Sequence, residues 1–188
     1  HTVLSGIPGM YGLGNSPTPA SPFGIYRPAT VPADLIPQYV HILGGLTTSV
    51  ESSIPQQAPL NIKSADPLQP PMGPTQKVTI GTIVGTRSGD KGGDANLGVY
   101  ARDDNGWAWL DNALTIEELK RLLPETADLI IERYRYPKIR SLNFLIRGLL
   151  QEGVAASTRQ DPQAKALGEW LRGRQLDIPI SIIKEAKR

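Results

Sequence analysis

The sequence predicts an α+β domain in its second part, behind an irregular first part. Most of the 17 prolines lie before Gln76, and proline interrupts both helices and central strands. After Gln76, short runs alternate apolar with polar residues, as half-buried strands do. Two stretches with helical spacing lie between and after these runs, so strands and helices are interleaved.

Four strands are predicted in this regular part. The first covers residues 78–84, where Val78, Ile80, Thr82 and Val84 alternate with more polar positions. The second covers 95–101, and the residues from Asp103 to Gly106 close it with turn chemistry. The third and fourth cover 129–136 and 142–146, with a turn centred on Pro137 between them.

Two helices complete the pattern. Thr115 and Glu118 form a capping box, in which the Thr115 side chain accepts from the Glu118 amide and the Glu118 carboxylate reaches back. This predicts a helix that ends at Pro124. Asp161 and Pro162 predict the start of a last helix, whose apolar face would comprise Ala164, Leu167, Trp170 and Leu171.

The order is therefore strand, strand, helix, strand, strand, helix. A ferredoxin-like fold entered at its second strand gives this order. We predict a circularly permuted ferredoxin-like sandwich over residues 76–188, with a four-stranded antiparallel sheet and two helices on one face.

Residues 1–46 are predicted to form an extended arm rich in Pro and Gly, and residues 47–75 a linker. Residues 31–46 contain at best one helical turn and one short strand. Large apolar residues favour an arm that lies on another domain, subunit or partner chain, while a mobile tail is the alternative. His41 in the short apolar run is a packing residue or a ligand.

Composition excludes several classes of function. The chain has no cysteine, which rules out disulfide scaffolds, thiolate metal sites and a cysteine nucleophile. Its net charge of +2 is spread over mixed charges rather than a basic stripe, so we expect no nucleic-acid partner. We find no apolar run long enough to span a membrane, and we expect a cytoplasmic protein. No metal-ligand spacing stands out, and nothing in the sequence requires a cofactor.

The segment from Gly85 to Asn96 is the main candidate for a functional site. It places four glycines among charged and polar residues between two predicted strands, and we interpret it as a site-building loop. It is neither a Walker A loop nor a Rossmann fingerprint, since Lys91 is followed by Gly and a strand follows the loop. The backbone amides would form an anion-binding nest, with Arg87, Ser88, Gly89, Gly92, Gly93 and Asn96 as binding residues.

Within this loop, Lys91 would add to the anion site, and Asp90 and Asp94 are candidates for acid, base or Mg²⁺ ligand. Asp90 and Lys91 are the candidate catalytic residues. The alternative is that Asp90 pairs with Lys91 or Arg87 at a solvated loop tip.

A second polar cluster contains Ser157 and Arg159, just ahead of the predicted helix at Asp161. A helix start is a natural anion site, although ordinary capping by Asp161 is the alternative. Asn143 is either a satisfied buried amide or a site residue. We interpret Trp107, Trp109 and Trp170 as packing residues rather than stacking platforms.

These motifs resemble the acyclic terpene utilisation protein A (AtuA-like) family. The resemblance covers residues 78–179 and rests on Arg87 to Gly93, Ala95 to Gly98, Leu123 to Thr126, Leu142 to Phe144, Gly148 to Leu150, Gly153 to Ser157, Asp161 to Lys165, Leu167 to Leu171 and Asp177 to Pro179. Asp94 departs from the Asn expected in many relatives.

The resemblance implies a larger α/β domain ahead of a small ferredoxin-like one, and residues Ser5 to Pro19 look like the end of that larger domain. We therefore expect a fragment, or a subunit of a homo- or hetero-oligomer whose partner supplies the rest. Family members resemble proteins of branched acyclic terpenoid and acyl-CoA breakdown, found alongside a biotin-dependent geranyl-CoA carboxylase route.

Two functional hypotheses follow. In the first, the chain is part of an enzyme, a hydratase or lyase, that acts on a branched carboxylate or its CoA thioester. Arg87 and Lys91 would hold the anion, Asp90 would transfer a proton, and Asn96 and Asn143 would orient the substrate. In the second, the domain assembles or regulates a larger complex without catalysis.

Overall fold

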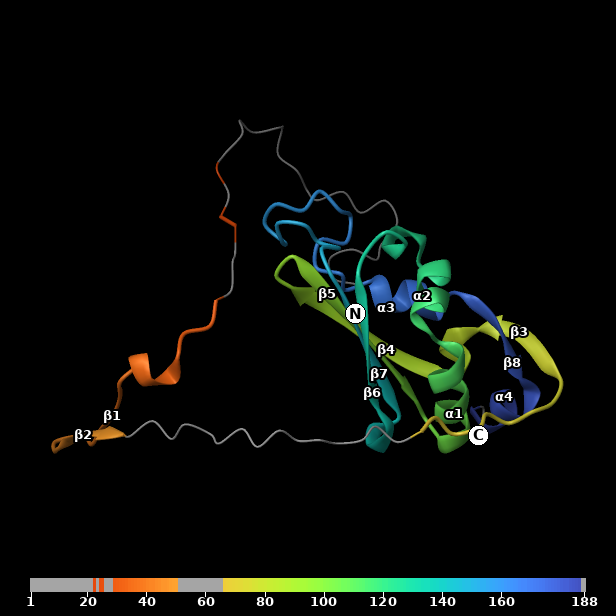
Figure 1. Cartoon of the computed structure of the whole chain (residues 1–188), viewed down its shortest axis with the longest axis horizontal. Helices are drawn as coiled ribbons and strands as arrows, with labels where there is room; N and C mark the ends of the chain where they lie inside the picture. The colour runs from red at the N-terminus through yellow and green to blue at the C-terminus, as the bar shows by residue number, and fades with distance from the viewer. Residues whose placement is uncertain (1–21, 23, 26–28, 51–65, 187–188) are drawn as a thin grey trace. The chain divides into compact units, whose positions relative to one another are not determined.

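The computed structural model describes residues 22, 24–25, 29–50 and 66–186 (Figure 1). They fall into two compact units, one with residues 29–50 and the other with residues 22, 24–25 and 66–186, and each is described by itself. The segment Ser5 to Pro19 and residues 51–65 of the expected linker lie outside the described residues.

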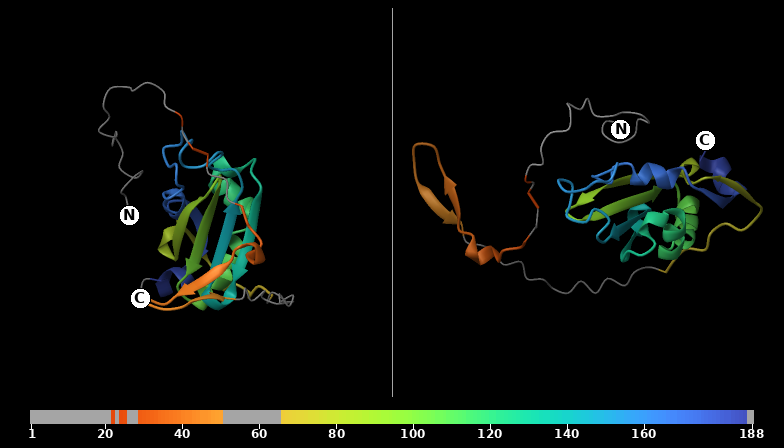
Figure 2. Two further views of the ribbon diagram at one scale, coloured as in Figure 1. Left: turned by 90° about the vertical axis from the view of Figure 1, so that its left-hand side faces the viewer. Right: turned by 90° about the horizontal axis from the view of Figure 1, so that it is seen from above.

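The larger unit is built on an antiparallel four-stranded sheet with the strand order β4-β5-β7-β6. A ferredoxin-like sheet entered at its second strand has this order. The α+β, circularly permuted ferredoxin-like prediction is therefore confirmed. The strands lie side by side in the left-hand view of Figure 2 and comprise β4 (Val84–Lys91), β5 (Asp94–Ala101), β6 (Ile131–Tyr136) and β7 (Ser141–Ile146).

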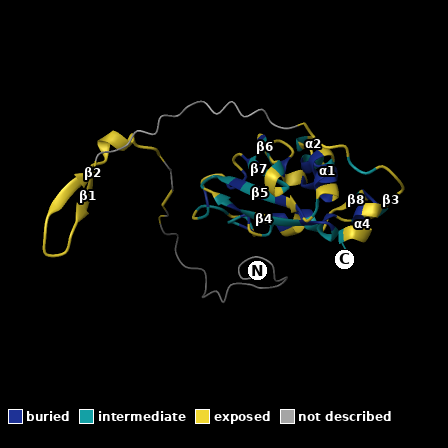
Figure 3. Cartoon of the chain, turned by 90° about the horizontal axis from the view of Figure 1, so that it is seen from below, coloured by how far each residue is buried: buried dark blue, intermediate teal, exposed yellow. Residues whose placement is uncertain are grey.

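Helices α1 (Asp104–Ala113), α2 (Ile116–Leu122) and α3 (Leu167–Arg172) pack on one face of this sheet. That face supplies every second residue of β5 and β7, and these are buried, whereas their neighbours in the strands are less so. The core lies between the sheet and the helices (Figure 3) and includes Leu97, Val99, Leu142, Phe144, Leu110, Leu119, Leu167 and Leu171. The opposite, open face carries three exposed tyrosines, Tyr100, Tyr134 and Tyr136.

Three helices, rather than the two predicted, flank the sheet, because Asp103 begins a helix instead of a turn. Its carboxylate accepts from the Gly106 amide at 2.7 Å and caps α1. Thr115 caps α2 as predicted, since its hydroxyl accepts from the Glu118 amide at 3.1 Å. The Glu118 carboxylate pairs with Arg121 at 2.6 Å instead of reaching back to the Thr115 backbone as predicted.

The single strand predicted for residues 78–84 is wrong. Strand β3 (Thr75–Thr79) ends first, a 3-10 turn (η2, Ile80–Thr82) follows, and β4 then begins. The turn forms because Ile80 and Ile83 are both buried in the core, which strict alternation does not permit. Strand β3 pairs with β8 (Gln175–Pro179) in a separate two-stranded sheet, followed by α4 (Ile180–Ala186), and neither β8 nor α4 was predicted (Figure 1).

The last of the predicted helices begins at Leu167 rather than at Asp161. Ala164 has a left-handed φ of 51°, which a continuous helix does not allow. The Asp161 carboxylate instead accepts from the amides of Lys165 and Ala166 at 2.8 and 2.9 Å. Leu167 and Leu171 are buried as predicted, but Trp170 is 41% exposed and does not belong to the buried face.

The smaller unit contains a 3-10 turn (η1, Ala33–Leu35) and a hairpin of β1 (Gln38–His41) and β2 (Thr47–Val50). β2 falls in the segment expected to be a linker. Every residue of both strands is exposed (Figure 3). His41 is likewise exposed, and its Nδ1 lies 2.9 Å from the Thr47 hydroxyl, so it is not a half-buried packing residue.

Candidate functional site: a basic cleft between β4 and α3

The glycine-rich segment is a regular hairpin, not a loop. Its residues pair continuously from Val84 opposite Ala101 to Lys91 opposite Asp94, and only Gly92 and Gly93 form the turn. Two-residue turns favour glycine because they require positive φ, and Gly92 has φ 67°. The predicted nest of loop amides is therefore wrong, because this backbone belongs to a strand ladder.

Strand geometry divides the motif between the two faces of the sheet, since successive side chains alternate. Ser88 and Asp90 lie opposite the buried residues Leu97 and Ala95, so they share the face that carries the helices. Arg87 lies opposite Gly98 and therefore belongs to the open face.

The remaining members of the motif also belong to the open face. Gly89 lies opposite Asn96, and Lys91 opposite Asp94. Lys91 Nζ donates to the carbonyl of Asp90 at 2.8 Å. Within the described part of the chain, Asp90 makes no ion pair with Lys91 or Arg87.

Ser88 connects β4 to the start of α3. Its hydroxyl accepts from the Gly168 amide at 3.0 Å and lies 3.3 Å from the Lys165 carbonyl, to which it donates. Gly168 has to be glycine for this approach, because a Cβ there would lie 2.7 Å from Thr86 Oγ1. The Ser88 hydroxyl thus serves first to fix α3 against the edge strand of the sheet.

A cleft of about 330 Å³ lies along this junction, and we call it the β4–α3 cleft. It brings together polar and charged side chains from both elements and from β5, namely Thr86, Arg87, Ser88, Tyr100, Lys165, Glu169 and Arg172. Three of these side chains are cationic and one is anionic. The Tyr100 ring reaches across Gly85, where a Cβ would come within 2.2 Å of the ring.

Two residues that line the cleft each carry a buried polar atom without a hydrogen-bond partner, Thr86 Oγ1 and Arg172 Nε. Arg172 pairs with Glu169 through Nη1 at 2.9 Å. No ion pair engages Arg87 or Lys165 in the described part of the chain. Since buried polar groups are normally paired, these atoms and the excess of positive charge favour an anionic ligand.

Asn96 and Asn143 meet on the open face, where Asn96 Nδ2 donates to Asn143 Oδ1 at 3.3 Å. Each therefore partly satisfies the other, and neither lines the β4–α3 cleft. Asn143 was expected to be either a satisfied amide or a site residue, and this hydrogen bond favours the satisfied amide.

Asp94 has a structural role at the end of the hairpin. Its carboxylate accepts from the Gly148 amide at 2.8 Å and pairs with Arg147 at 2.7 Å. Arg147 also pairs with Glu132, and the Tyr134 hydroxyl and Arg147 together lower the pKa of Glu132. The carboxylate at position 94 thus links the hairpin to the segment that follows β7.

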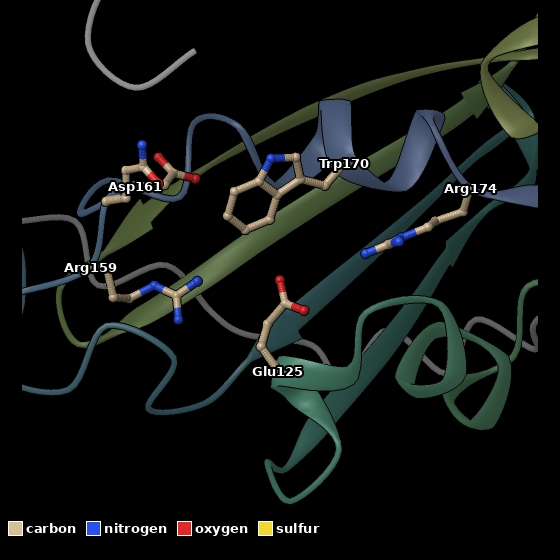
Figure 4. Close-up of a pocket in the computed structure, with 6 residues that line it drawn as sticks. Glu125, Arg159, Asp161, Trp170 and Arg174 are labelled. Atoms are coloured by element: carbon tan, nitrogen blue, oxygen red, sulfur yellow. The ribbon is translucent and has the colours of Figure 1, made fainter. Parts of the chain in front are cut away.

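The second polar cluster lies apart from the cleft residues. The Ser157 hydroxyl accepts from the Arg159 amide at 3.3 Å, which forms a local turn. Arg159 lines a different depression, beside Trp170 (Figure 4). The structure therefore groups Arg87 and Ser88 of the predicted site in one cleft and places Arg159 in another.

Sequence reasoning missed Thr86, Tyr100, Lys165, Glu169 and Arg172 as cleft residues. Lys165, Glu169 and Arg172 are spaced by four and three residues, which is the spacing of one helix face. The sequence contained this helical spacing. It did not indicate that this face packs against β4.

A comparison with protein families shows to which family the chain belongs. The model of the AtuA ferredoxin-like domain matches residues 78–177. The chain belongs to this family. The match includes the whole four-stranded sheet and α3, and hence every residue of the β4–α3 cleft. No curated protein and no solved structure matches the chain. None of the described helices is long and apolar enough to cross a membrane.

Proposed function

We propose that this AtuA domain binds the anionic end of a branched acyclic carboxylate, or of its CoA thioester, in the β4–α3 cleft. The observation that carries the proposal is the excess of cations in this cleft, two of whose lining residues also carry a buried polar atom without a hydrogen-bond partner, Thr86 Oγ1 and Arg172 Nε. In this proposal the domain is part of a cytoplasmic AtuA-like enzyme of terpenoid or acyl-CoA catabolism.

The chemistry of the cleft suits a carboxylate. A guanidinium presents a planar set of donors that matches two carboxylate oxygens. Arg87 and Arg172 each supply a guanidinium to the cleft. Lys165 adds an ammonium group, whose nitrogen lies 3.9 Å from the position that a Cβ of Gly89 would occupy. The hydroxyls of Thr86 and Tyr100 complete the donor set.

The reaction would be a hydration or a lyase step, with Asp90 as the group that transfers a proton. Asp90 does not line the cleft, but it lies on the same face of β4 as Thr86 and Ser88. Residues two apart in a strand are about 7 Å apart. In this proposal, a carboxylate held beside Ser88 extends its carbon chain along this face toward Asp90.

Arg172→Gln is expected to weaken binding of geranate, a branched acyclic carboxylate, about tenfold or more, because a charge-assisted hydrogen bond is lost. Isothermal titration of the full chain measures this. The matched control is Lys138→Gln, which removes one positive charge from an exposed 3-10 turn outside the cleft. Equal affinity for the parent chain and Arg172→Gln would refute the proposed cleft.

Asp90→Asn distinguishes the enzymatic hypothesis from the architectural one. If Asp90 transfers the proton, the variant assembles normally but loses turnover of geranyl-CoA, followed by mass as the gain of water. Native mass spectrometry reports assembly in the same sample. A variant with an assembly defect, or with unchanged turnover, contradicts the enzymatic role.

The second candidate, assembly into a larger complex, is favoured by the β1–β2 hairpin. Isolated two-stranded hairpins are marginally stable in water, and this one exposes large apolar residues, including Tyr39, Val40, Ile42 and Leu43. Such a surface calls for a covering partner. We propose that the partner is the larger AtuA-like domain, as a separate subunit of an oligomer.

Native mass spectrometry of the protein from its source tests this partnership. We expect the 20.4 kDa chain to travel with a second polypeptide, and substitution of Tyr39 and Leu43 by Ser to release it. Migration of the unsubstituted chain as a monomer would contradict the assembly role.

A further inference from the structure

A second depression, distinct from the β4–α3 cleft, lies next to Trp170 of α3. We call it the Trp170 groove, and its volume is about 490 Å³. It brings together η3 (Pro124–Thr126), the segment ahead of α3, Trp170 of α3 and Arg174, which lies two residues after the end of α3 (Figure 4). Its lining consists of Glu125, Arg159, Gln160, Asp161, Trp170 and Arg174.

Trp170 gives this groove an aromatic wall. Its neighbours Leu167 and Leu171 are fully buried, whereas Trp170 is 41% exposed and its indole borders the groove (Figure 4). The other two tryptophans, Trp107 and Trp109, are only 3% and 6% exposed. Trp170 thus offers a flat surface on which a planar ring can stack, the role that the sequence analysis did not favour.

Charged groups face the same space. In Figure 4 the Glu125 carboxylate lies between the guanidinium groups of Arg159 and Arg174. No ion pair joins Glu125 to either arginine within the described residues. Arg159 Nε is buried and has no hydrogen-bond partner. A second carboxylate of the lining, Asp161, already accepts from the amides of Lys165 and Ala166. The groove therefore combines an uncommitted acceptor, two cations and an aromatic wall.

We propose that the Trp170 groove binds a purine nucleotide that carries an exocyclic amino group, either free or as the adenosine end of CoA. The base stacks on the Trp170 indole. The Glu125 carboxylate accepts from the amino group, and Arg159 and Arg174 bind the phosphates. A phosphate alone would leave the indole unused, and a branched carboxylate offers no ring, so the nucleotide accounts for all of these groups.

Nucleotide analogues separate these contacts. Titrations of the full chain with ADP and purine riboside 5′-diphosphate, followed by tryptophan fluorescence, compare bases with and without the amino group of adenine, and GDP and IDP make the same comparison for guanine. In the pair that the groove binds, we expect the analogue without the amino group to bind more weakly. In Glu125→Gln the ratio of the two affinities in that pair should fall toward one. Equal affinities of the parent chain within both pairs would overturn the assignment of Glu125.

Substitutions test the Trp170 ring and the arginines of the groove. Trp170→Ala should weaken ADP binding about tenfold, and Trp170→Phe, which keeps a ring, should restore most of it. Arg159→Gln should weaken ADP but not adenosine, which lacks phosphates. Lys138→Gln is again the charge-matched control, and thermal unfolding confirms that each variant folds. Unchanged ADP affinity in folded Trp170→Ala and Arg159→Gln would refute the groove as a nucleotide site.

The source of the nucleotide is read from the same titrations. Tighter binding of CoA than of ADP, lost in Arg159→Gln, identifies CoA, whereas equal or weaker binding of CoA identifies a free nucleotide. The result is independent of the proposed carboxylate site. Geranate binding depends on Arg172 and nucleotide binding on Arg159, so either can fail while the other holds.

Discussion

Asp111→Ala is expected to lower the free energy of unfolding by about 3 kcal/mol, as removal of one partner from a buried ion pair does. The Asp111 side chain is 1% exposed and pairs with Arg133 at 2.9 Å and Arg135 at 2.5 Å. Arg133 also donates to the Asp111 and Leu114 carbonyls. These contacts tie α1 to β6, and the substitution leaves two largely buried guanidinium groups without their carboxylate.

The pH dependence of stability provides a second readout for Asp111. Burial opposes ionisation, but hydrogen bonds from Arg135 and Arg133 outweigh it and lower the pKa of the carboxyl below its ordinary value. A group whose folded pKa is lowered stabilises the protein above its unfolded pKa, and that stability disappears as the pH falls through the folded value.

Chemical denaturation of the parent chain and Asp111→Ala, near neutral pH and in acid, measures both effects. The difference in stability between the two proteins should be largest near neutral pH and should shrink in acid. A constant difference across this range would show that the carboxylate charge does not hold α1 to β6.

Gly93→Ala is expected to destabilise the chain by about 2–3 kcal/mol, because the site has no room for a side chain. A Cβ at this position would lie 2.2 Å from the carbonyl oxygen of Gln151, which is backbone and cannot rotate away. The Leu150 amide also donates to the Gly93 carbonyl at 2.9 Å. The substitution would push the segment after β7 away from the hairpin.

Gly98→Ala is the matched control for this prediction. Gly98 lies in the same hairpin, on β5, and its added Cβ would make only an ordinary contact, 3.5 Å from the Arg87 carbonyl. Thermal or chemical unfolding of both variants measures the difference. Equal stability of Gly93→Ala and Gly98→Ala would mean that the segment after β7 does not pack on the hairpin turn as described.

The sequence predicted those elements whose residues alternate or repeat regularly. β5, β6, β7 and α2 appear within a few residues of their predicted ranges, because apolar side chains at strand or helix spacing fill one core. Their order, together with a first strand that was placed too early at residues 78–84, predicted the permuted ferredoxin-like sheet.

The glycine hairpin escaped prediction because the inner face of β4 is polar near its end. Ser88 occupies an inward position but caps the start of α3 instead of filling the core. The pattern of apolar alternation is therefore lost where the strand makes its tertiary contact. The short helix α3 likewise begins later than predicted, because the carboxylate of Asp161 holds a turn ahead of it.

The candidate site was predictable only in part for the same reason. Arg87 and Ser88 were recognisable in a polar motif, but Lys165 and Arg172 join them through the packing of α3 on β4. Asp90, Lys91, Asn96 and Asn143 share the sheet with these residues yet do not line the cleft. Local sequence shows which residues are unusual, whereas the fold determines which of them meet.

The most direct test of the carboxylate site is an NMR titration of the isotope-labelled chain with geranate. The proposal predicts that the amide shifts of Arg87, Ser88 and Gly168 move together with those of Lys165 and Arg172, and that Arg172→Gln needs about tenfold more geranate or higher for the same response. Shifts confined to the open face of the sheet, or no saturable shifts in the β4–α3 cleft, would contradict it.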